Sequence, residues 1–218
     1  MIKLQELSNI PSLCKGTDQS QIIETMAAAF QRFQKFDMIN FIYLDGKSIR
    51  YNGSTVALGD RPYFKKVIAT KKPVISDPLI SKATGKGSVT LAVPVFYNGT
   101  LTGVLTATYS LERLSDVVKE IKFKESGYGF IAVQTGLVIA HPVVSEAIGK
   151  LNISQKKIDP GLKLAENELD DDLIGLFARA STENSQVRGN YIFNGASQFA
   201  VATPIRLPGG QQWTLMIA

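Results

Sequence analysis

The stretch FIYLDG at residues 41–46 has a counterpart later in the chain, FIAVQTG at residues 130–136. Both are short apolar runs that end in a glycine turn. A second pair follows in the same order: AVPVFYNG at residues 92–99 and ATPIRLPG at residues 202–209 share the pattern Ala-x-Pro-(Val/Ile)-x-x-x-Gly. Two matches in the same order predict two similar structural units, because a repeated sequence pattern reflects repeated supersecondary structure.

Turn chemistry indicates that the repeated segments form β-hairpins. Residue pairs that favour tight turns lie between β-rich runs at Asp45-Gly46, Asn98-Gly99 and Gly209-Gly210. The second hairpin of each unit enters its closing strand four residues after the motif glycine, at Gly103 and at Trp213. Strands at both ends of each unit, with helices between them, predict an α+β fold in which each antiparallel sheet has helices on one side.

Apolar residues at helical spacing predict helices over residues 19–35, 111–122 and 160–180. Asp18 is a candidate N-cap of the first helix and Ser110 of the second, which would connect the two units. Pro160 suits the first turn of the third helix. We interpret its acidic run, residues 170–172, as a solvated face.

Composition excludes several classes of function. The 218 residues carry a net charge of +5 without clustered arginines, so nucleic-acid binding is not expected. Cys14 is the only cysteine and His141 the only histidine, which excludes zinc sites of the usual ligand types. Glycine-rich phosphate motifs do not occur, and the acidic residues lack the spacing of a calcium loop. We therefore expect neither a metal nor a cofactor.

The sequence as given is expected to contain neither a membrane span nor a signal peptide. No stretch approaches the ~20 apolar residues that cross a bilayer, and residues 1–6 lack the basic and apolar pattern of a signal peptide. As written, the chain is expected to be soluble, an expectation that also fits an excised piece of a membrane protein.

Three threonines favour a polar cavity. Thr90, Thr106 and Thr108 alternate along predicted strands, and alternation places side chains on one face of a sheet. If helices cover that face, the threonines line a polar cavity. The alternative is a face exposed to solvent.

Several motifs, in order along the chain, resemble those of the double Cache sensor domains. They are DRPYF at 60–64, VISDP at 74–78, ATG at 83–85, AVPV at 92–95, GTLTGVL at 99–105, GYGF at 127–130 and IAHP at 139–142. The resemblance covers about residues 20–218. It implies two tandem PAS-like (Cache) modules with antiparallel sheets on a long N-terminal helix.

The resemblance also implies a domain order and a location. Residues 1–35 would form the truncated N-terminal stalk helix, 36–120 the membrane-distal ligand-binding module and 121–218 the membrane-proximal module. The domain would lie outside the cell membrane, periplasmic or extracellular, with transmembrane helices missing from this chain. A homodimer through the N-terminal helix is a further expectation.

Family members that bind amino acids hold the ligand carboxylate with an Arg followed by two aromatics, and this chain retains that part as Arg61, Tyr63 and Phe64. Those members hold the amino group with a Tyr and two Asp residues. The corresponding positions here are Leu79, Ser81 and Thr108, and Val56 stands where an aromatic is expected. None of these side chains offers an anion to an ammonium group.

We therefore predict a pocket in the first module for a small polar ligand without an α-ammonium group, such as a carboxylate, because an ammonium buried without an anionic partner is costly. The predicted ligand-binding residues are Tyr43, Arg61, Tyr63, Phe64, Asp77, Leu79, Ser81, Thr90 and Thr108. Asp77 is the one nearby carboxylate that would rescue an amine.

Other interpretations stay open at this point. Arg61 fits a surface ion pair with Asp60 or Asp77 as well as a ligand clamp. His141 invites a catalytic reading, but no nucleophile motif accompanies it, so an α+β hydrolase is disfavoured and no enzyme activity is expected of this region. A structural or dimerising module without a ligand is the remaining alternative. For the cytoplasmic output, a sensor histidine kinase is favoured over a chemoreceptor.

Overall fold

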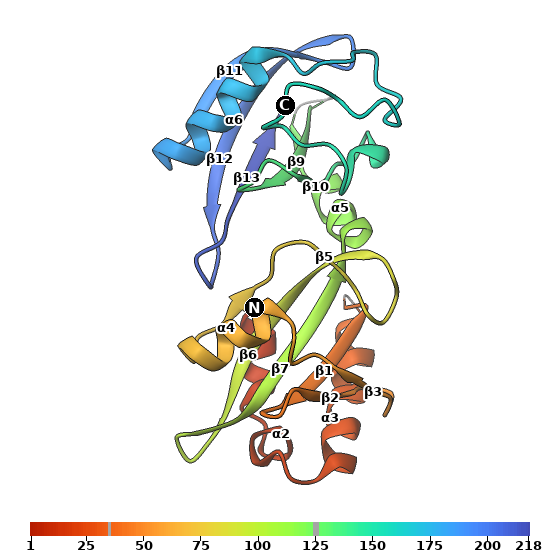
Figure 1. Ribbon diagram of the computed structural model, residues 1–218, viewed down its shortest axis with the longest axis vertical. Coiled ribbons are helices and arrows are strands. Elements are labelled where there is room, and N and C mark those ends of the chain that lie inside the picture. Colours follow the sequence, from red (N-terminus) through yellow and green to blue (C-terminus); the bar gives the residue numbers. More distant parts are fainter. Residues whose placement is uncertain (35, 124–126) are drawn as a thin grey trace. The chain divides into compact units, whose positions relative to one another are not determined.

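The computed structural model describes residues 1–34, 36–123 and 127–218 (Figure 1). The α+β class and the antiparallel sheets are confirmed. The chain forms two compact units, Met1–Ser110 with Pro208–Gly210, and Leu111–Leu207 with Gln211–Ala218. The second unit therefore begins about ten residues before the predicted boundary at 120/121, because helix α5 (Leu111–Lys119) packs on strands of the second sheet.

The first sheet has the strand order β3-β2-β1-β7-β6-β4, with β5 paired to β6. Its strands are β1 (Met38–Tyr43), β2 (Lys47–Arg50), β3 (Thr55–Ala57), β4 (Val74–Ile75), β5 (Leu79–Ile80), β6 (Gly87–Tyr97) and β7 (Thr100–Ser110). The predicted turns at Asp45-Gly46 and Asn98-Gly99 connect β1 to β2 and β6 to β7. Gly46 and Gly99 both have positive φ, which glycine adopts without steric cost.

The N-terminal segment is not one long helix, contrary to the prediction for residues 1–35. It forms α1 (Ile2–Ser8), α2 (Pro11–Lys15) and α3 (Gln19–Phe33). Pro11 starts α2, and Gly16 ends it in the left-handed conformation, which breaks the helical path. The predicted N-cap of α3 is confirmed, since the Asp18 carboxylate accepts a hydrogen bond from the Gln21 amide.

Helices cover both faces of the first sheet, which corrects the expectation of helices on one side. On one face, α1 to α3 pack against the odd-numbered residues of β1, such as Ile39 and Phe41. On the other, α4 (Pro62–Thr70) packs against Ile42, Ala92 and Val104. Strand β1 is buried on both faces, so its sequence is apolar on both faces except at Asn40, rather than alternating.

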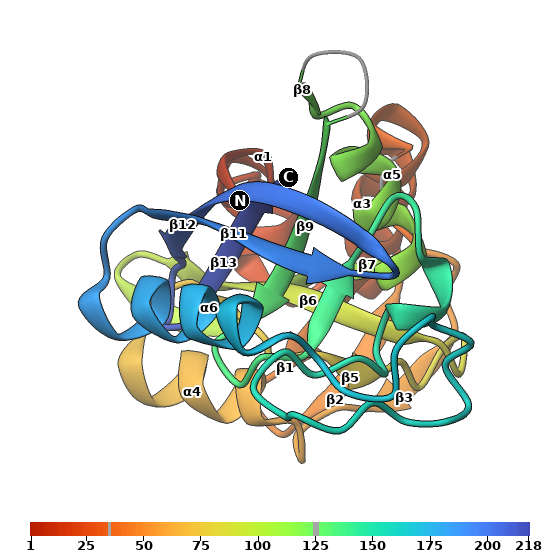
Figure 2. The same ribbon diagram turned by 90° about the horizontal axis from the view of Figure 1, so that it is seen from above.

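The second sheet has the order β10-β9-β13-β12-β11, with β8 paired to β9. Its strands are β8 (Lys122–Phe123), β9 (Gly127–Val133), β10 (Val138–Ala140), β11 (Val187–Phe193), β12 (Ala196–Arg206) and β13 (Gln212–Ile217). Helix α6 (Asp171–Glu183) lies along β11 and β12 (Figure 2) and closes the core of this unit. A short 3-10 turn, η1 (Ser145–Ala147), follows β10.

The helix predicted over residues 160–180 begins eleven residues later than expected. Asp170 is its N-cap, and its carboxylate accepts hydrogen bonds from the Asp172 and Leu173 amides. The acidic run at 170–172 thus starts the helix, where carboxylates are favoured at the positive end of the helix dipole, and Asp171 and Asp172 are exposed to solvent as expected. Pro160 lies in the preceding loop. The helix predicted over 111–122 is confirmed as α5, although it ends at Lys119.

Over the described ranges 1–34, 36–123 and 127–218, no helix combines the length and the apolar character needed to span a bilayer.

Candidate functional site

A polar row crosses the first sheet on the face that carries α4. Arg50 on β2 lies opposite Asn40 on β1, and Asn40 lies opposite Thr106 on β7. Thr106 in turn lies opposite Ala92 on β6. The Asn40 amide Nδ2 donates to Thr106 Oγ1 at 3.1 Å. Directly opposed residues share a face, so Arg50, Asn40 and Thr106 form one continuous polar strip.

A second polar row lies two residues along the same strands. Thr108 on β7 is opposite Thr90 on β6, and their hydroxyl oxygens are 3.4 Å apart. Both threonines are buried, as is Thr106. The Thr90 amide donates to Ser76 Oγ at 2.9 Å, which ties β6 to the segment after β4. The predicted common face of the three threonines is confirmed, and helix α4 rather than solvent covers the sheet on that side.

Helix α4 brings Arg61 and Tyr63 over this polar face. Arg61 is the N-cap residue and Pro62 occupies the first turn, where its missing amide donor costs nothing. The Arg61 guanidinium donates through Nη2 to the Ile80 carbonyl at 3.0 Å. Tyr63 is buried, and that burial raises its pKa to about 12, so its phenol stays neutral and keeps its proton.

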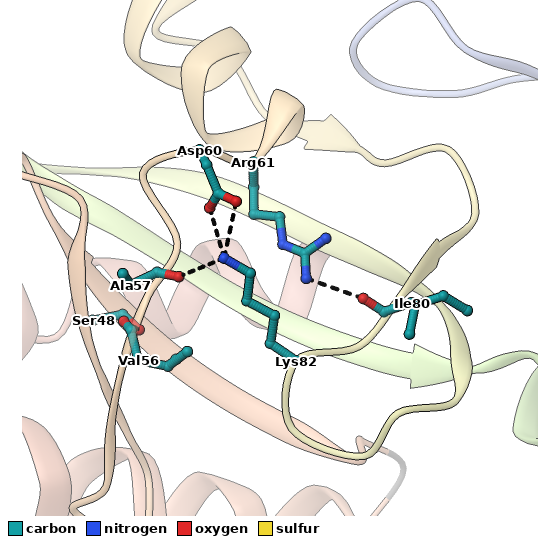
Figure 3. A network of polar contacts seen from close by, with 7 residues as sticks. All are labelled: Ser48, Val56, Ala57, Asp60, Arg61, Ile80 and Lys82. Carbon is teal, nitrogen blue, oxygen red and sulfur yellow. Dashed lines mark hydrogen bonds and ion pairs between the residues drawn. The ribbon is translucent and has the colours of Figure 1, made fainter.

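Lys82 bridges the loop after β5 to the loop before α4 (Figure 3). Its ammonium donates to the Ala57 carbonyl at 3.0 Å and to both carboxylate oxygens of Asp60 at 2.9 Å. The hydrogen bond from Lys82 lowers the pKa of Asp60. Asp60 is thus paired with Lys82, and Arg61 bonds a backbone carbonyl instead, so the surface ion-pair interpretation of Arg61 is wrong.

These elements enclose a small pocket between α4, the 79–83 segment and the sheet. It is lined by Met38, Asn40, Arg50, Val56, Leu58, Arg61, Tyr63, Leu79, Ser81, Lys82, Ala83, Thr90 and Thr108. The space around these side chains measures about 330 Å³ including the solvent at its mouth, and only about 20 Å³ of it admits the centre of a water molecule. The pocket in this structure is therefore narrow, because its own side chains fill most of it.

Three buried polar atoms of this pocket have no hydrogen-bond partner within the described part of the chain. They are Asn40 Oδ1, Arg50 Nε and Arg61 Nε. Buried polar groups are nearly always paired, and unpaired ones cost about 1–3 kcal/mol each. Among the described lining residues none is Asp or Glu, whereas Arg50, Arg61 and Lys82 are cationic. The residues that line the pocket therefore carry polar atoms without hydrogen-bond partners and more positive than negative charge.

Six of the predicted site residues line this pocket: Arg61, Tyr63, Leu79, Ser81, Thr90 and Thr108. The other three do not. Tyr43 faces α1 to α3, because it shares the odd-numbered face of β1 with Phe41. Phe64 is buried in the core under α4. Asp77 is exposed to solvent, so its carboxylate is not available to neutralise an ammonium in the pocket.

The sequence prediction missed seven lining residues, namely Met38, Asn40, Arg50, Val56, Leu58, Lys82 and Ala83. For Asn40 a signal exists. It is the one polar residue in the apolar run MINFIY of β1, and a polar side chain inside a buried strand indicates either a hydrogen-bond network or a site. Arg50 carries no comparable signal, because it ends a strand that reads as ordinary surface sequence.

His141 in the second unit is held by local bonds. Its Nδ1 accepts hydrogen bonds from the Val143 and Val144 amides at 3.2 and 3.0 Å, and its ring stacks on Phe130. Burial lowers the pKa of His141 to about 4, so the ring is neutral at physiological pH. With Nδ1 occupied by backbone donors, Nε2 carries the proton. The ring therefore lacks a free basic nitrogen for catalysis, which supports the structural interpretation.

A family model described as a Cache domain, dCache_1, matches residues 1–218. The chain belongs to the double Cache family. Double Cache domains are extracytoplasmic sensor regions of membrane receptors.

Among curated proteins, the methyl-accepting chemotaxis protein PscA of Pseudomonas syringae pv. tomato is 26% identical over 143 residues. That match covers 59% of this double Cache chain and 23% of PscA. The chain thus corresponds to about a quarter of the length of that relative.

Two solved structures show the same fold. The ligand-binding domain of the Pseudomonas aeruginosa PAO1 amino-acid chemoreceptor PctC, in complex with GABA, is 20% identical with a TM-score of 0.68, over 100% of this chain and 88% of that one. The extracellular domain of mmHK1S-Z3, described as a histidine kinase, is 15% identical with a TM-score of 0.71, over 99% and 84%. At these identities the likeness concerns the double Cache fold alone.

Proposed function

We propose that this chain is the extracytoplasmic ligand-sensing region of a transmembrane signalling receptor. The first unit is the ligand-binding module, and its ligand is a small carboxylate without an α-ammonium group. The carboxylate sits between the N-terminal turn of α4 and the polar face of the first sheet. Arg61 is its main partner, because a guanidinium presents a planar pair of donors that matches a carboxylate.

The observation that carries this proposal is the unpaired Nε of Arg61. Arg61 Nη2 is bonded to the Ile80 carbonyl, while Nε is buried without a partner in the described chain. A bound carboxylate oxygen would supply the missing acceptor. It would also offset positive charge in a pocket whose described lining contains no acid.

The same lining argues against an α-amino acid. Leu79, Ser81 and Thr108 stand where amino-acid-binding members place the groups that hold the ammonium, and all three line the pocket. Asp77, the one carboxylate that would compensate, is exposed to solvent. An ammonium would find only neutral acceptors, such as the Thr90 and Thr108 hydroxyls, and that environment disfavours a buried cation.

Binding requires the pocket to expand, because its present interior admits little more than a water molecule. Expansion needs the 79–86 segment to separate from the loop before α4, where Lys82 and Arg61 now bridge them. A ligand that binds only the expanded form shifts the population towards it, and the output follows from that difference in affinity. The narrow pocket is also the observation that favours the second candidate, a structural module without a ligand.

Isothermal titration calorimetry on a panel of small carboxylates and α-amino acids tests the proposal. Arg61→Ala should abolish carboxylate binding, a loss of about 2–5 kcal/mol for a charged partner removed from a closed site. Lys66→Ala removes a charge from the exposed side of the same helix and is the matched control. Asp77→Asn should leave the affinity unchanged.

Tight binding of an α-amino acid, with carboxylates inert, would contradict the ligand class. Carboxylate binding that survives Arg61→Ala would contradict the site. The output domain is a separate matter: the similar proteins include a chemotaxis receptor and a histidine kinase sensor domain, so a histidine kinase output and a chemoreceptor output both stay predictions.

A further inference from the structure

We propose that Arg50 is a second anion-binding residue of the pocket and that the ligand is a dianion, a short dicarboxylate. This inference rests on the proposed function of the first unit and narrows its ligand class. It assigns a role to a residue outside the motif that identifies Arg61.

Arg50 reaches the pocket from a different element than Arg61 does. It is the last residue of β2, in the polar row beside Asn40, whereas Arg61 caps α4 above the sheet. Both side chains line the same pocket. A ligand between them therefore meets one guanidinium from the sheet and one from the helix.

The hydrogen bonds of Arg50 are incomplete. Its Nη1 donates to Ser54 Oγ at 3.3 Å, a long bond at an exposed position. Its Nε is buried and has no partner in the described residues. A guanidinium has five donors, and leaving the inner Nε unpaired is unfavourable unless something else accepts from it. Arg50 on the sheet and Arg61 on α4 thus share the same feature, a buried Nε without a hydrogen-bond partner among the described residues.

Charge balance sets the number of anionic groups. Among the described lining residues the cations are Arg50, Arg61 and Lys82, and none of the lining residues is acidic. Lys82 is already neutralised by Asp60. The two arginines are left without an anion, so a monocarboxylate compensates one and a dicarboxylate compensates both. Two like charges that share a poorly solvated space favour the ligand that neutralises the pair.

Asn40 contributes a third contact of a different kind. Its Oδ1 is buried and unpaired in the described chain, while its Nδ2 is occupied by Thr106. Asn40 lies next to Arg50 in the polar row. An acceptor at this point suits a hydroxyl on the ligand backbone between the two carboxylates, and a hydroxylated dicarboxylate should therefore bind more tightly than the plain one.

The test is calorimetry with succinate and with succinamate, its monoamide, which has nearly the same shape and one charge fewer. The wild type should bind succinate at least about 10-fold more tightly, as expected for one additional charge-assisted hydrogen bond. Arg50→Gln should bring this ratio close to one. Lys47→Gln, which removes a charge from the opposite face of β2, and Ser54→Ala, which removes the turn bond of Arg50, should both keep the wild-type ratio.

Each other outcome has a distinct meaning. A succinate preference that persists in Arg50→Gln overturns the role of Arg50 and leaves the proposed function intact. Tight binding of inorganic phosphate with no dicarboxylate binding shows that both arginines hold one group, and it overturns the two-carboxylate ligand. If only α-amino acids bind the wild type, the proposed function itself fails. Circular dichroism of Arg50→Gln and Arg50→Lys checks that both variants fold.

Discussion

The two sheets of this protein share a strand order but differ in one row of side chains. In the first unit, Ala92 lies opposite Thr106, which lies opposite Asn40. In the second, the equivalent alanine of the repeated motif, Ala202, lies opposite Met216, which lies opposite Phe130. The same row of the same fold is polar in one unit and apolar in the other.

The residues beside Asn40 and Phe130 also differ between the units, since one is charged and the other is a neutral ring. In the first unit Arg50 lies beside Asn40, lines the pocket and has a buried Nε without a partner among the described residues. In the second, the neutral ring of His141 stacks on Phe130. The apolar row completes a continuous core under α6. The comparison teaches that one scaffold carries a fully packed apolar row in one unit and a polar row with unpaired atoms in the other, at a cost in stability for the second kind of row.

The largest expected effect comes from truncating the apolar row. Phe130→Ala should destabilise the second unit by about 3–5 kcal/mol, since it removes a large buried side chain and leaves a cavity. Asn40→Ala, at the equivalent place in the first unit, should cost less than about 1 kcal/mol because the Asn40 amide is only half satisfied. Urea unfolding measures both, with fluorescence of Trp213, the only tryptophan, reporting on the second unit. Equal losses of unfolding free energy in the two variants would show that the polar and the apolar row contribute equally to stability.

The second effect is a pH dependence confined to the second unit. His141 has a pKa of about 4 in the folded state, lowered by burial from an ordinary 6.5. Between these values the unfolded chain binds a proton that the folded chain excludes, so stability falls as the pH drops from about 6.5 to 4, by about 3 kcal/mol in total.

His141→Asn is the matched variant for this test. Its side-chain oxygen can accept from the Val143 and Val144 amides, as histidine Nδ1 does, but it does not titrate. The difference in unfolding free energy between wild type and variant should shrink towards pH 4 and be constant above pH 7. A difference that stays flat across this range would show that His141 keeps its ordinary pKa.

Replacing the polar row of the first unit by apolar residues should stabilise that unit and weaken ligand binding. The double variant Asn40→Leu/Thr106→Val replaces both partners of a buried hydrogen bond by apolar groups of similar shape. The first unit should become more stable by about 1–2 kcal/mol, because an unpaired amide oxygen is lost as well. Carboxylate binding should weaken in the same protein. A less stable variant would indicate that water already satisfies Asn40.

The smallest effects are expected from the lysine bridges, which both units possess. Lys82 binds Asp60 near the start of α4, and Lys156 binds Asp171 in the first turn of α6 at 2.6 Å. Both pairs are largely exposed, so Lys82→Gln and Lys156→Gln should change the melting temperature little. Only Lys82→Gln should speed ligand association in stopped-flow measurements, since only that bridge spans a pocket. If Lys82→Gln and the wild type bound the ligand at equal rates, the Lys82–Asp60 bridge would have no part in opening the pocket.

Much of this comparison could be predicted from the sequence, because turns and motifs are local. The hairpins at residues 41–46 and 92–99, the closing strands at Gly103 and Trp213, and the common face of the threonines all follow from turn chemistry and two-residue periodicity. The residue-by-residue correspondence between β1 and β9 could not be predicted in this way. An alignment of Phe41 with Phe130 puts these residues in equivalent places, but the structure makes Asn40 the equivalent of Phe130. A shift of one residue exchanges the faces of a strand.

That shift explains why the site was only partly predicted. Tyr43 was assigned to the pocket although it lies on the odd-numbered face of β1, and Asn40 was missed although it lies on the even-numbered one. A local motif marks Arg61 and Tyr63, and both line the candidate pocket. Arg50 and Lys82 reach the pocket through strand pairing and loop closure, which depend on long-range contacts that no local pattern records.

Strand β1 also fixes how a binding event can travel. Asn40 faces the pocket, while its sequence neighbours Ile39 and Phe41 pack against Ile22 and Met26 of α3. Side chains packed at this density hardly compress, so they pass a displacement on. Under the proposed function, a ligand that pulled Asn40 towards itself would also displace Ile39 and Phe41, and with them the α3 side chains in the same core cluster.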